Sequence, residues 1–291
     1  MKKDHPLTLR SAHACFGGAQ RYYEHASSTI GLPMRFSVYL PPTAVAAQAH
    51  KVPALVYLAG LTCTEETFMT KAGAQRLASQ LGLALIAPDT SPRGAGIEGE
   101  ADNWDFGVGA GFYLDATQAP WSRHWRMESY LIDELLPLLG QYLPIDTTRL
   151  GLCGHSMGGH GALTLALRHP GVFASLSAFA PISHPSQCPW GRNAFQRYLG
   201  DDPVRWAMHD ATLLMRQQER APYPAGILVD QGLADQFLHD NQLQPDALEA
   251  ACAAASQPLT LRRHAGYDHG YYFIQTFMDD HLRHHARQVG A

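Results

Sequence analysis

One serine lies in a sequence context that can support nucleophilic chemistry. Residues 154–158 read GHSMG, with an apolar run before them at 150–153 and a helical pattern that begins at Gly158. A serine at a sharp turn from strand to helix presents its hydroxyl, and the helix start supplies free N–H groups and a positive dipole end where negative charge develops. A glycine-rich turn with an incidental serine would not need this context. We therefore predict Ser156 as the nucleophile and the N–H of Met157 as an oxyanion donor.

An acid must help to activate such a serine, because an isolated hydroxyl is a poor nucleophile. Where the G-x-S-x-G turn is used, the acid and then the histidine follow the serine in the chain. The run at 227–230 predicts a late strand, and the loop beyond it carries Asp235. Asp235 is the preferred acid, since a loop carboxylate can reach a histidine. Asp230 ends the strand and is the alternative, for which we expect a structural role.

The base must be chosen among sixteen histidines. His269 lies in the sequence GYDHG, between the last predicted strand and the last predicted helix, which is the position that the arrangement requires. His264 belongs to the strand itself, where we expect packing or edge exposure. His155 and His160 flank the serine and are expected to support the turn.

Three further histidines, His281, His284 and His285, lie on the last predicted helix at spacings that could bind a metal. No carboxylate or cysteine is arranged with them around a predicted buried cavity. We therefore expect a solvated helix end here, and no metal site.

Alternating apolar runs and helical patterns predict the elements that position these residues. Their order predicts an α/β fold with a mostly parallel central sheet flanked by helices on both faces. We expect strands at 36–40, 52–59, 83–87, 150–153, 173–180, 227–230 and 259–264, and helices at 73–81, 129–143, 158–169, 246–255 and 272–287.

Two insertions are expected in a single domain spanning residues 1–291. They lie near 90–125, a stretch rich in glycine and aromatic residues, and near 183–222, and both are interpreted as lid-like. The loop that follows the predicted strand at 52–59 is the expected source of a second oxyanion donor, the N–H of Leu61. Cys63, two residues further on, is expected to border the substrate cleft, with a small packing residue as the alternative.

Composition narrows the function class. The net charge is −4 and 16% of residues are charged, which gives no general attraction to nucleic acid or an anionic membrane. No run approaches the ~20 apolar residues needed to span a bilayer, and residues 1–6 lack the apolar segment of a secretory signal. Five scattered cysteines, without a C-x-x-C pair, argue against a disulfide framework or structural zinc. We expect a cytoplasmic protein.

Several segments together resemble the S-formylglutathione hydrolase (esterase D) family. The segments are YLAGLTCTEETF, NWDFGVGAGFYLDAT, GHSMGGHGAL, DQGLADQFL and GYDHGYYFI, and the match runs from about residue 10 to 288. The resemblance implies an α/β-hydrolase fold, hydrolysis of S-formylglutathione during formaldehyde detoxification, no metal or organic cofactor, and a cytoplasmic, often dimeric protein. It assigns the triad to Ser156, Asp235 and His269. Gly270 departs from the family pattern, which usually has serine there.

The expected substrate is therefore a small glutathione thioester. A tight acyl pocket is expected, closed by Trp190 or Phe237, with the glutathione moiety near Trp104. The nearest alternative is a short-chain carboxylesterase or acyltransferase on the same scaffold, and a remote one is a non-catalytic binding module.

Overall fold

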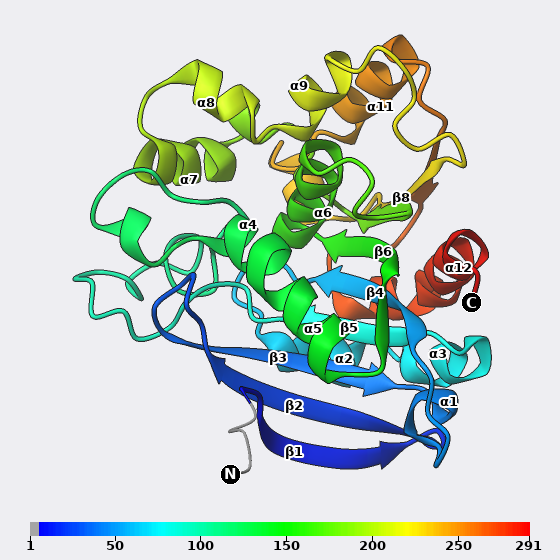
Figure 1. Ribbon diagram of the computed structural model, residues 1–291. Helices are drawn as coiled ribbons and strands as arrows, with labels where there is room; N and C mark the ends of the chain where they lie inside the picture. Colours follow the sequence, from blue (N-terminus) through cyan, green and yellow to red (C-terminus); the bar gives the residue numbers. More distant parts are fainter. Residues whose placement is uncertain (1–5) are drawn as a thin grey trace.

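The computed structural model describes residues 6–291, and its centre is a single nine-stranded sheet (Figure 1). The strand order is β1-β2-β3-β5-β4-β6-β7-β8-β9. The strands are β1 (Thr8–Cys15), β2 (Gly18–Ala26), β3 (Pro33–Leu40), β4 (Val52–Leu58), β5 (Ala84–Pro88), β6 (Ile145–His155), β7 (Ser175–Phe179), β8 (Ile227–Gly232) and β9 (Leu259–His264). Residues 1–5, which carry part of the argument against a secretory signal, lie outside the described residues.

The sheet has an antiparallel part and a parallel part. From β1 to β5, neighbouring strands pair antiparallel, and from β5 to β9 all neighbours are parallel. Every residue of β4, β5, β7 and β8 is buried, as expected for parallel strands covered on both faces. The predicted mostly parallel sheet is thus confirmed.

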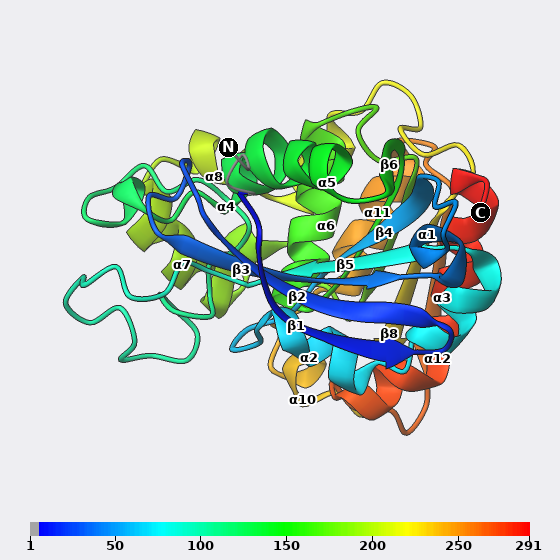
Figure 2. The ribbon, with the colours of Figure 1, turned by 60° about the horizontal axis from the view of Figure 1, so that its bottom comes forward.

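Helices cover both faces of this sheet. Figure 2 shows α5 and α6 on one side and α2, α3 and α12 on the other. The helices are α1 (Pro42–Val45), α2 (Glu65–Lys71), α3 (Gln75–Leu81), α4 (Met127–Ser129), the π-helical turn η2 (Tyr130–Leu135), α5 (Leu136–Tyr142), α6 (Met157–Arg168), α7 (Pro189–Leu199), α8 (Pro203–Ala207), α9 (Ala211–Arg216), α10 (Gln236–His239), α11 (Pro245–Ala254) and α12 (Tyr271–Val289), with short 3₁₀ turns η1 (Trp121–Arg123) and η3 (Pro185–Gln187).

The expectation of a solvated end for α12 is wrong. His281 and His285 are fully buried and His284 is 9% exposed, because α12 lies against the sheet and presents these side chains to β7. His285 hydrogen-bonds the hydroxyls of Ser175 and Ser177, at 2.7 Å each. The serines of β7 give the histidines polar partners inside the protein, so the polar stripe of α12 faces inward.

The segments near 90–125 and 183–222 contact one another beside the carboxyl ends of the parallel strands (Figure 1). The first contains little regular structure, while the second carries α7, α8 and α9. The hydroxyl of Tyr198 accepts from the N–H of Gly107 at 3.0 Å, and its carbonyl accepts from the N–H of Thr117 at 2.7 Å. The guanidinium of Arg197 lies 3.4 Å from the ring centre of Phe106. These contacts join the two segments above the site.

Candidate active site

Ser156 occupies a strained turn between β6 and α6. Its backbone lies at φ 58° and ψ −119°, a conformation that is costly for a residue with a side chain. The turn is tightly packed, since a Cβ on Gly158 would lie 1.9 Å from the carbonyl oxygen of Leu58, and one on Gly154 would lie 2.0 Å from that of Gly158. The N–H of Ser156 donates to the carbonyl of Phe179 at 3.0 Å. Both glycines of the GHSMG sequence are therefore required sterically.

Two backbone N–H groups beside this serine, those of Met157 and Leu61, are without an acceptor in the described part of the chain. Met157 is the first residue of α6, so its N–H has no intrahelical acceptor. Within residues 6–291, the N–H of Leu61 makes no hydrogen bond to backbone or side chain. A Cβ on Gly60 would lie 3.1 Å from the Cβ of Ser156, which shows how closely the loop approaches the serine. The arrangement offers two donors near one hydroxyl.

The loop that carries Leu61 is fixed by the glycine-rich segment. Thr62 has a left-handed backbone, at φ 68°, and its N–H donates to the carbonyl of Gly109 at 2.9 Å. The carbonyl of Cys63 accepts from the Thr90 hydroxyl at 2.6 Å and from Arg93 at 3.2 Å. These bonds hold the loop in position independently of any ligand.

Asp235 and His269 form a hydrogen-bonded pair. Asp235 is the N-cap of α10 and is completely buried, and its Oδ2 lies 2.6 Å from Nδ1 of His269. The carboxylate also accepts from the N–H of Phe237 at 2.8 Å and from the side-chain amide of Gln231 at 3.2 Å. With Nδ1 donating to the carboxylate, Nε2 of the imidazole is the nitrogen left for proton transfer.

The imidazole of His269 is held between two other rings. The ring of His155 lies 4.4 Å away at 47°, and that of Phe237 lies 4.8 Å away and nearly perpendicular. His155 is buried and, within residues 6–291, neither of its ring nitrogens has a hydrogen-bond partner. Burial, with the neighbouring His269 as a second cause, lowers the pKa of His155 well below its usual value. His155 is therefore a neutral packing partner of His269.

A pocket of about 190 Å³ brings these groups together. Its lining comprises Gly60, Leu61, Thr62, Cys63, Trp104, His155, Ser156, Trp190, Phe237 and His269. Of the residues predicted to bind substrate, Cys63, Trp104, Trp190 and Phe237 all line it. Trp190 is the centre of an aromatic wall, with its ring 5.4 Å from that of Trp104 and 4.6 Å from that of Phe237. Asp235 lies behind His269 and does not line the pocket.

Asp230, the alternative acid, lies away from the pocket. Its carboxylate is fully buried and receives both Nε and Nη2 of Arg262 at 2.6 Å, together with Nε2 of His281 at 3.2 Å. His264 lies 3.2 Å from the same carboxylate and stacks on Phe277. These contacts agree with structural roles for Asp230 and His264. His160, next to the serine turn, bonds the carbonyl of Phe112 at 3.1 Å and so also supports the fold.

Some residues around the site carry no motif in the sequence. Gln231 hydrogen-bonds Asp235, and Gln242 hydrogen-bonds the backbone of Trp190. Neither glutamine belongs to a recognisable motif, and Gln242 is also far from Trp190 in the sequence. Gly270 is the N-cap of α12 and supplies no side-chain cap, so the hydroxyl that a serine would provide is missing there. The N–H of Gly270 instead donates to the carboxylate of Asp268 at 2.9 Å. Only the adjacency of Gln231 to the predicted strand end could have drawn attention to it.

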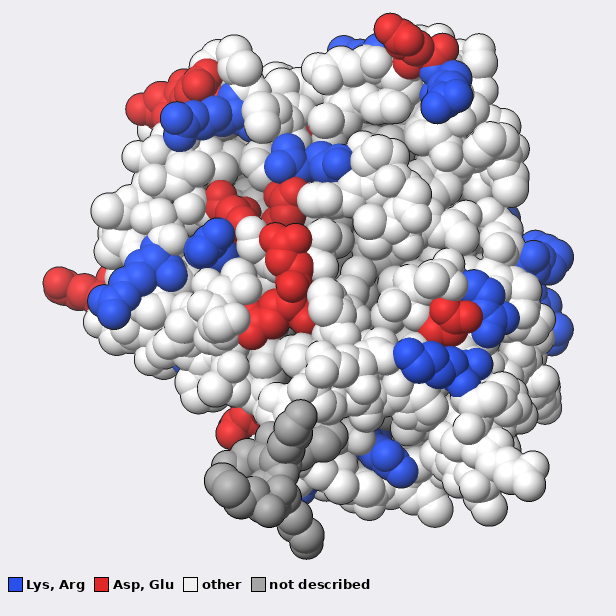
Figure 3. Space-filling model, viewed as in Figure 1, with Lys and Arg blue, Asp and Glu red and all other residues white. Residues whose placement is uncertain are grey.

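Within residues 6–291, no three histidine, cysteine or acidic side chains are grouped so as to hold a metal ion. No helix in that part of the chain has the length and apolar character needed to cross a membrane. Figure 3 shows a mostly uncharged face with a column of acidic side chains near its middle, basic side chains at the upper end of that column, and small groups of charged side chains elsewhere.

The chain is similar to known esterases over nearly its whole length. The family model described as "Putative esterase" matches residues 27–284. The S-formylglutathione hydrolase of Rattus norvegicus is 50% identical over 281 residues, which is 97% of this chain and 98% of that protein. The enzyme of the same name from Arabidopsis thaliana is 53% identical over 94% of this chain and 95% of its own length.

A solved structure gives the same result. The S-formylglutathione hydrolase from Agrobacterium tumefaciens superimposes with a TM-score of 0.92 at 47% identity, covering 97% of this chain and all of that one. The predicted α/β-hydrolase architecture is therefore confirmed. Because enzymes of this name match nearly the whole chain at 47% to 53% identity, this chain belongs to the S-formylglutathione hydrolase family of the esterases.

Proposed function

We propose that this protein hydrolyses S-formylglutathione to glutathione and formate through a formyl ester on Ser156. The observation that carries the proposal is the 2.6 Å contact between Asp235 and His269 beside a pocket that both His269 and Ser156 line. Membership of a family whose named relatives are S-formylglutathione hydrolases supports the substrate. The free N–H groups of Leu61 and Met157 are the proposed oxyanion donors, and such a donor is typically worth ~10²–10³ in rate.

In the first half of the reaction, Oγ of Ser156 attacks the formyl carbon while its proton passes to Nε2 of His269. Asp235 stabilises the imidazolium that forms and holds the ring in the required tautomer. The carbon–sulfur bond then breaks, and the departing thiolate of glutathione takes the proton from His269. A thiol with a pKa of ~8.5 leaves readily, so weak acid assistance is sufficient. The products are a formyl-serine and glutathione.

In the second half, water replaces the thiol. His269 accepts a proton from water as the oxygen attacks the formyl-serine, the bond to Oγ breaks, and the proton returns to Ser156. Formic acid is formed and loses its remaining proton to solvent, so formate is released and the enzyme is restored. The same histidine and the same oxyanion donors therefore serve both steps.

The size of the pocket supports a small acyl group. A volume of about 190 Å³ is below the ~300–1,000 Å³ that is usual for pockets enclosing a drug-sized ligand. The reacting thioester fits there, and the peptide of glutathione must continue outside. Trp104 is 54% exposed at the edge of the lining and is the proposed contact for that peptide. Trp190 and Phe237 are proposed to limit the acyl group.

The decisive experiment compares kcat/KM for S-formylglutathione with that for p-nitrophenyl acetate. A preference of several orders of magnitude for the thioester is expected. A preference for the aryl ester would favour a short-chain carboxylesterase, and transfer of the formyl group to an added alcohol or thiol would favour an acyltransferase. Failure of Ser156 to react with a fluorophosphonate probe would contradict the whole mechanism.

We further propose that the protein acts in the cytoplasm and assembles as a homodimer. All five cysteines are free, which suits a reducing compartment. Dimerisation follows from the family resemblance, and light scattering coupled to size-exclusion chromatography tests it. A mass equal to one 31.9 kDa chain at working concentration would contradict the dimer.

A further inference from the structure

The aromatic wall of the pocket is built from two separate parts of the chain. Trp190 belongs to α7, and Phe237 belongs to α10, which follows Asp235. Their ring centres lie 4.6 Å apart at 59°, so the space available to an acyl group depends on how these two helices are held together. Packing between two rings alone leaves room for sliding, because aromatic contacts are satisfied over a range of offsets.

Gln242 connects the two parts directly. Its side-chain Oε1 accepts the N–H of Trp190 at 3.1 Å, and its own backbone N–H donates to the carbonyl of Phe237 at 2.9 Å. The residue is 9% exposed, so both bonds lie in a region of low water access, where a lost partner is costly. A single residue thus contacts the backbone on both sides of the wall.

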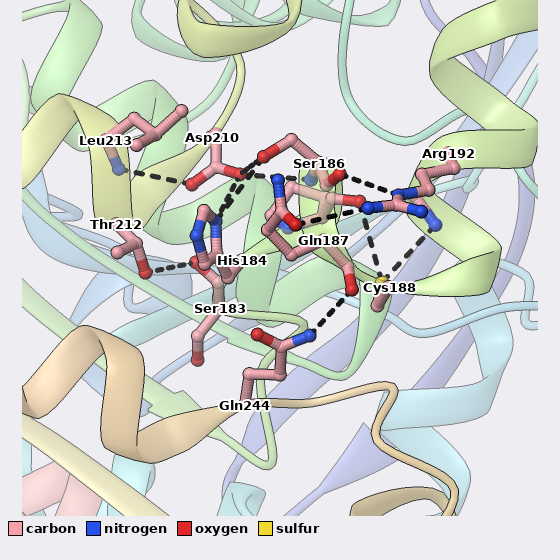
Figure 4. Close-up of polar contacts among 12 residues, drawn as sticks. Ser183, His184, Ser186, Gln187, Cys188, Arg192, Asp210, Thr212, Leu213 and Gln244 are labelled. Carbon is pink, nitrogen blue, oxygen red and sulfur yellow. Dashed lines mark hydrogen bonds and ion pairs between the residues drawn. The ribbon is translucent and has the colours of Figure 1, made fainter.

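The next two residues, Leu243 and Gln244, reinforce this connection. The N–H of Ser183 donates to the carbonyl of Leu243 at 2.8 Å, and the side-chain amide of Gln244 donates to the carbonyl of Gln187 at 2.9 Å. Figure 4 shows the second of these bonds. Gln244 has a left-handed backbone, at φ 50°, which is uncommon for this residue type. The chain therefore bends sharply where it holds the segment before α7.

A buried carboxylate fixes the same segment from another side. Asp210, at the start of α9, is fully buried and accepts from the N–H of Ser186 at 3.0 Å and from its hydroxyl at 2.7 Å, and it lies 2.7 Å from Nδ1 of His184 (Figure 4). The segment 183–188 is therefore anchored without Gln242. Gln242 in addition fixes the first turn of α7, which contains Trp190.

We propose that Gln242 is a positioning residue that sets acyl-chain selectivity by fixing Trp190 against Phe237. The proposal rests on the proposed function only in taking this pocket as the acyl site. Loss of the Oε1 acceptor frees the first turn of α7, the two rings separate, and longer acyl groups enter. Chemistry at Ser156 does not pass through Gln242, so turnover of the smallest acyl groups continues.

The test uses Gln242→Met, which keeps the length of the side chain and removes the acceptor, and Gln242→Glu, which keeps an acceptor oxygen. The measurement is the ratio of kcat/KM for p-nitrophenyl butyrate to that for p-nitrophenyl acetate. We expect Gln242→Met to raise this ratio on the order of tenfold, since two methylenes in a pocket of this kind are worth at least that much. We expect Gln242→Glu to stay within about twofold of the parent protein, as restoring the acceptor restores the wall.

The matched control is Gln236→Met. Gln236 is exposed on α10, where its amide bonds Asp240, so its replacement should leave the ratio unchanged. Equal loss of activity on both esters in Gln242→Met would mean a purely structural role and would overturn the proposal, as would failure of both Gln242 variants to fold. A parent protein that selects between the esters but ignores S-formylglutathione would reject the proposed substrate and leave this test valid.

Discussion

Two aspartate–histidine pairs are built from neighbouring parts of the same chain, yet they differ in nearly every other respect. Asp230 and Asp235 are both fully buried, and each contacts a histidine from the C-terminal part of the chain. His269, the partner of Asp235, has a side chain that is 16% exposed and lines the pocket. His281, the partner of Asp230, is completely buried on the side of the sheet that α12 covers.

The charge balance separates the pairs further. Against the effect of burial, the hydrogen bonds from His281 and from Arg262, which binds through two nitrogens, hold the pKa of the Asp230 carboxyl well below its usual range. Within residues 6–291, Asp235 has no ion pair with lysine or arginine, and its contacts are His269, an amide and a backbone N–H. An aspartate whose negative charge is already compensated has little to offer an imidazolium. Access to a pocket and an unneutralised carboxylate, more than the pair itself, distinguish the candidate catalytic pair.

Removing the nucleophile gives the largest expected effect. It tests whether the Asp235–His269 pair supports turnover without Ser156. Ser156→Ala should lower kcat by at least a hundredfold, because the other groups retain only the residual catalysis of binding and oxyanion stabilisation. Alanine keeps the Cβ, so circular dichroism and melting temperature should be unchanged. Retention of more than about a hundredth of the parent kcat would be incompatible with a triad.

Exchanging each aspartate for asparagine tests the comparison itself. Asp235→Asn should reduce kcat by about 10²–10⁴, since His269 loses the group that orients it and stabilises its charge. Asp230→Asn should leave kcat within a few-fold of the parent and lower the free energy of unfolding by about 3 kcal/mol, since Arg262 and His281 lose a buried charged partner. Kinetics and urea denaturation of both variants measure the two effects. A reversal, with Asp230→Asn inactive and Asp235→Asn merely unstable, would identify Asp230 as the catalytic acid.

Low pH should destabilise the protein through the buried histidines of α12. Burial lowers the pKa of His284 to about 4, so between pH 6.5 and pH 4 the unfolded chain binds a proton that the folded protein does not. The contribution of neutral His284 to the free energy of unfolding is therefore fully present above about pH 6.5 and is lost as pH falls toward 4. His284→Gln, which can still donate to the carbonyl of Leu176, should reduce the slope of unfolding free energy against pH by up to about 1.4 kcal/mol per unit between pH 5 and 6.

Denaturant titrations at half-unit pH intervals measure this slope in the parent and in His284→Gln. His13→Gln is a suitable control, since His13 is exposed on β1. An equal slope in all three proteins would mean that His284 is protonated in the folded state.

The smallest expected effect concerns inhibition by thiol reagents at the pocket. Cys63 lines the pocket, and burial raises the pKa of its thiol although Thr67, Tyr271 and Lys71 act in the opposite direction. Thiol reagents should therefore inactivate the enzyme slowly at neutral pH and faster as pH rises, and substrate should protect it. Cys63→Ser should remain active and become resistant.

Cys15→Ser is the matched control for that experiment, because Cys15 is also partly exposed but lies on β1. Undiminished inactivation of Cys63→Ser would point to another thiol. Cys153, beside the serine turn, is a poor candidate because it is fully buried and burial, as the largest of several causes, raises its pKa to about 12.

The sequence was most informative where local chemistry forces a pattern. The continuous apolar runs of β4 and β5 and the glycines around Ser156 are consequences of burial and close contact, and each could be predicted from residue types. Strands β1 and β2 were not predicted. β1 is largely exposed at the sheet edge, so no buried face imposes a hydrophobic alternation on it.

The burial of the histidines on α12 could not be predicted from the sequence for a related reason. Polar residues at helical spacing predict a solvated face unless partners exist, and the partners, Ser175 and Ser177, lie more than a hundred residues away. Gln242 is hidden in the same way, since its role depends on a backbone N–H of Trp190 in another segment. What a side chain meets across space is absent from local sequence wherever no motif accompanies it.

The contacts of the serine turn also divide the protein into parts that directed evolution can and cannot alter. Gly154 and Gly158 leave no room even for a methyl group, so libraries at these positions should return only the parent residue. The side chain of Trp190 contacts those of Trp104 and Phe237, and exchanges of ring size in this wall should leave the backbone around Ser156 untouched. New substrate ranges should therefore arise from mutations in the wall, while the turn that carries the nucleophile stays fixed as a module shared by all variants.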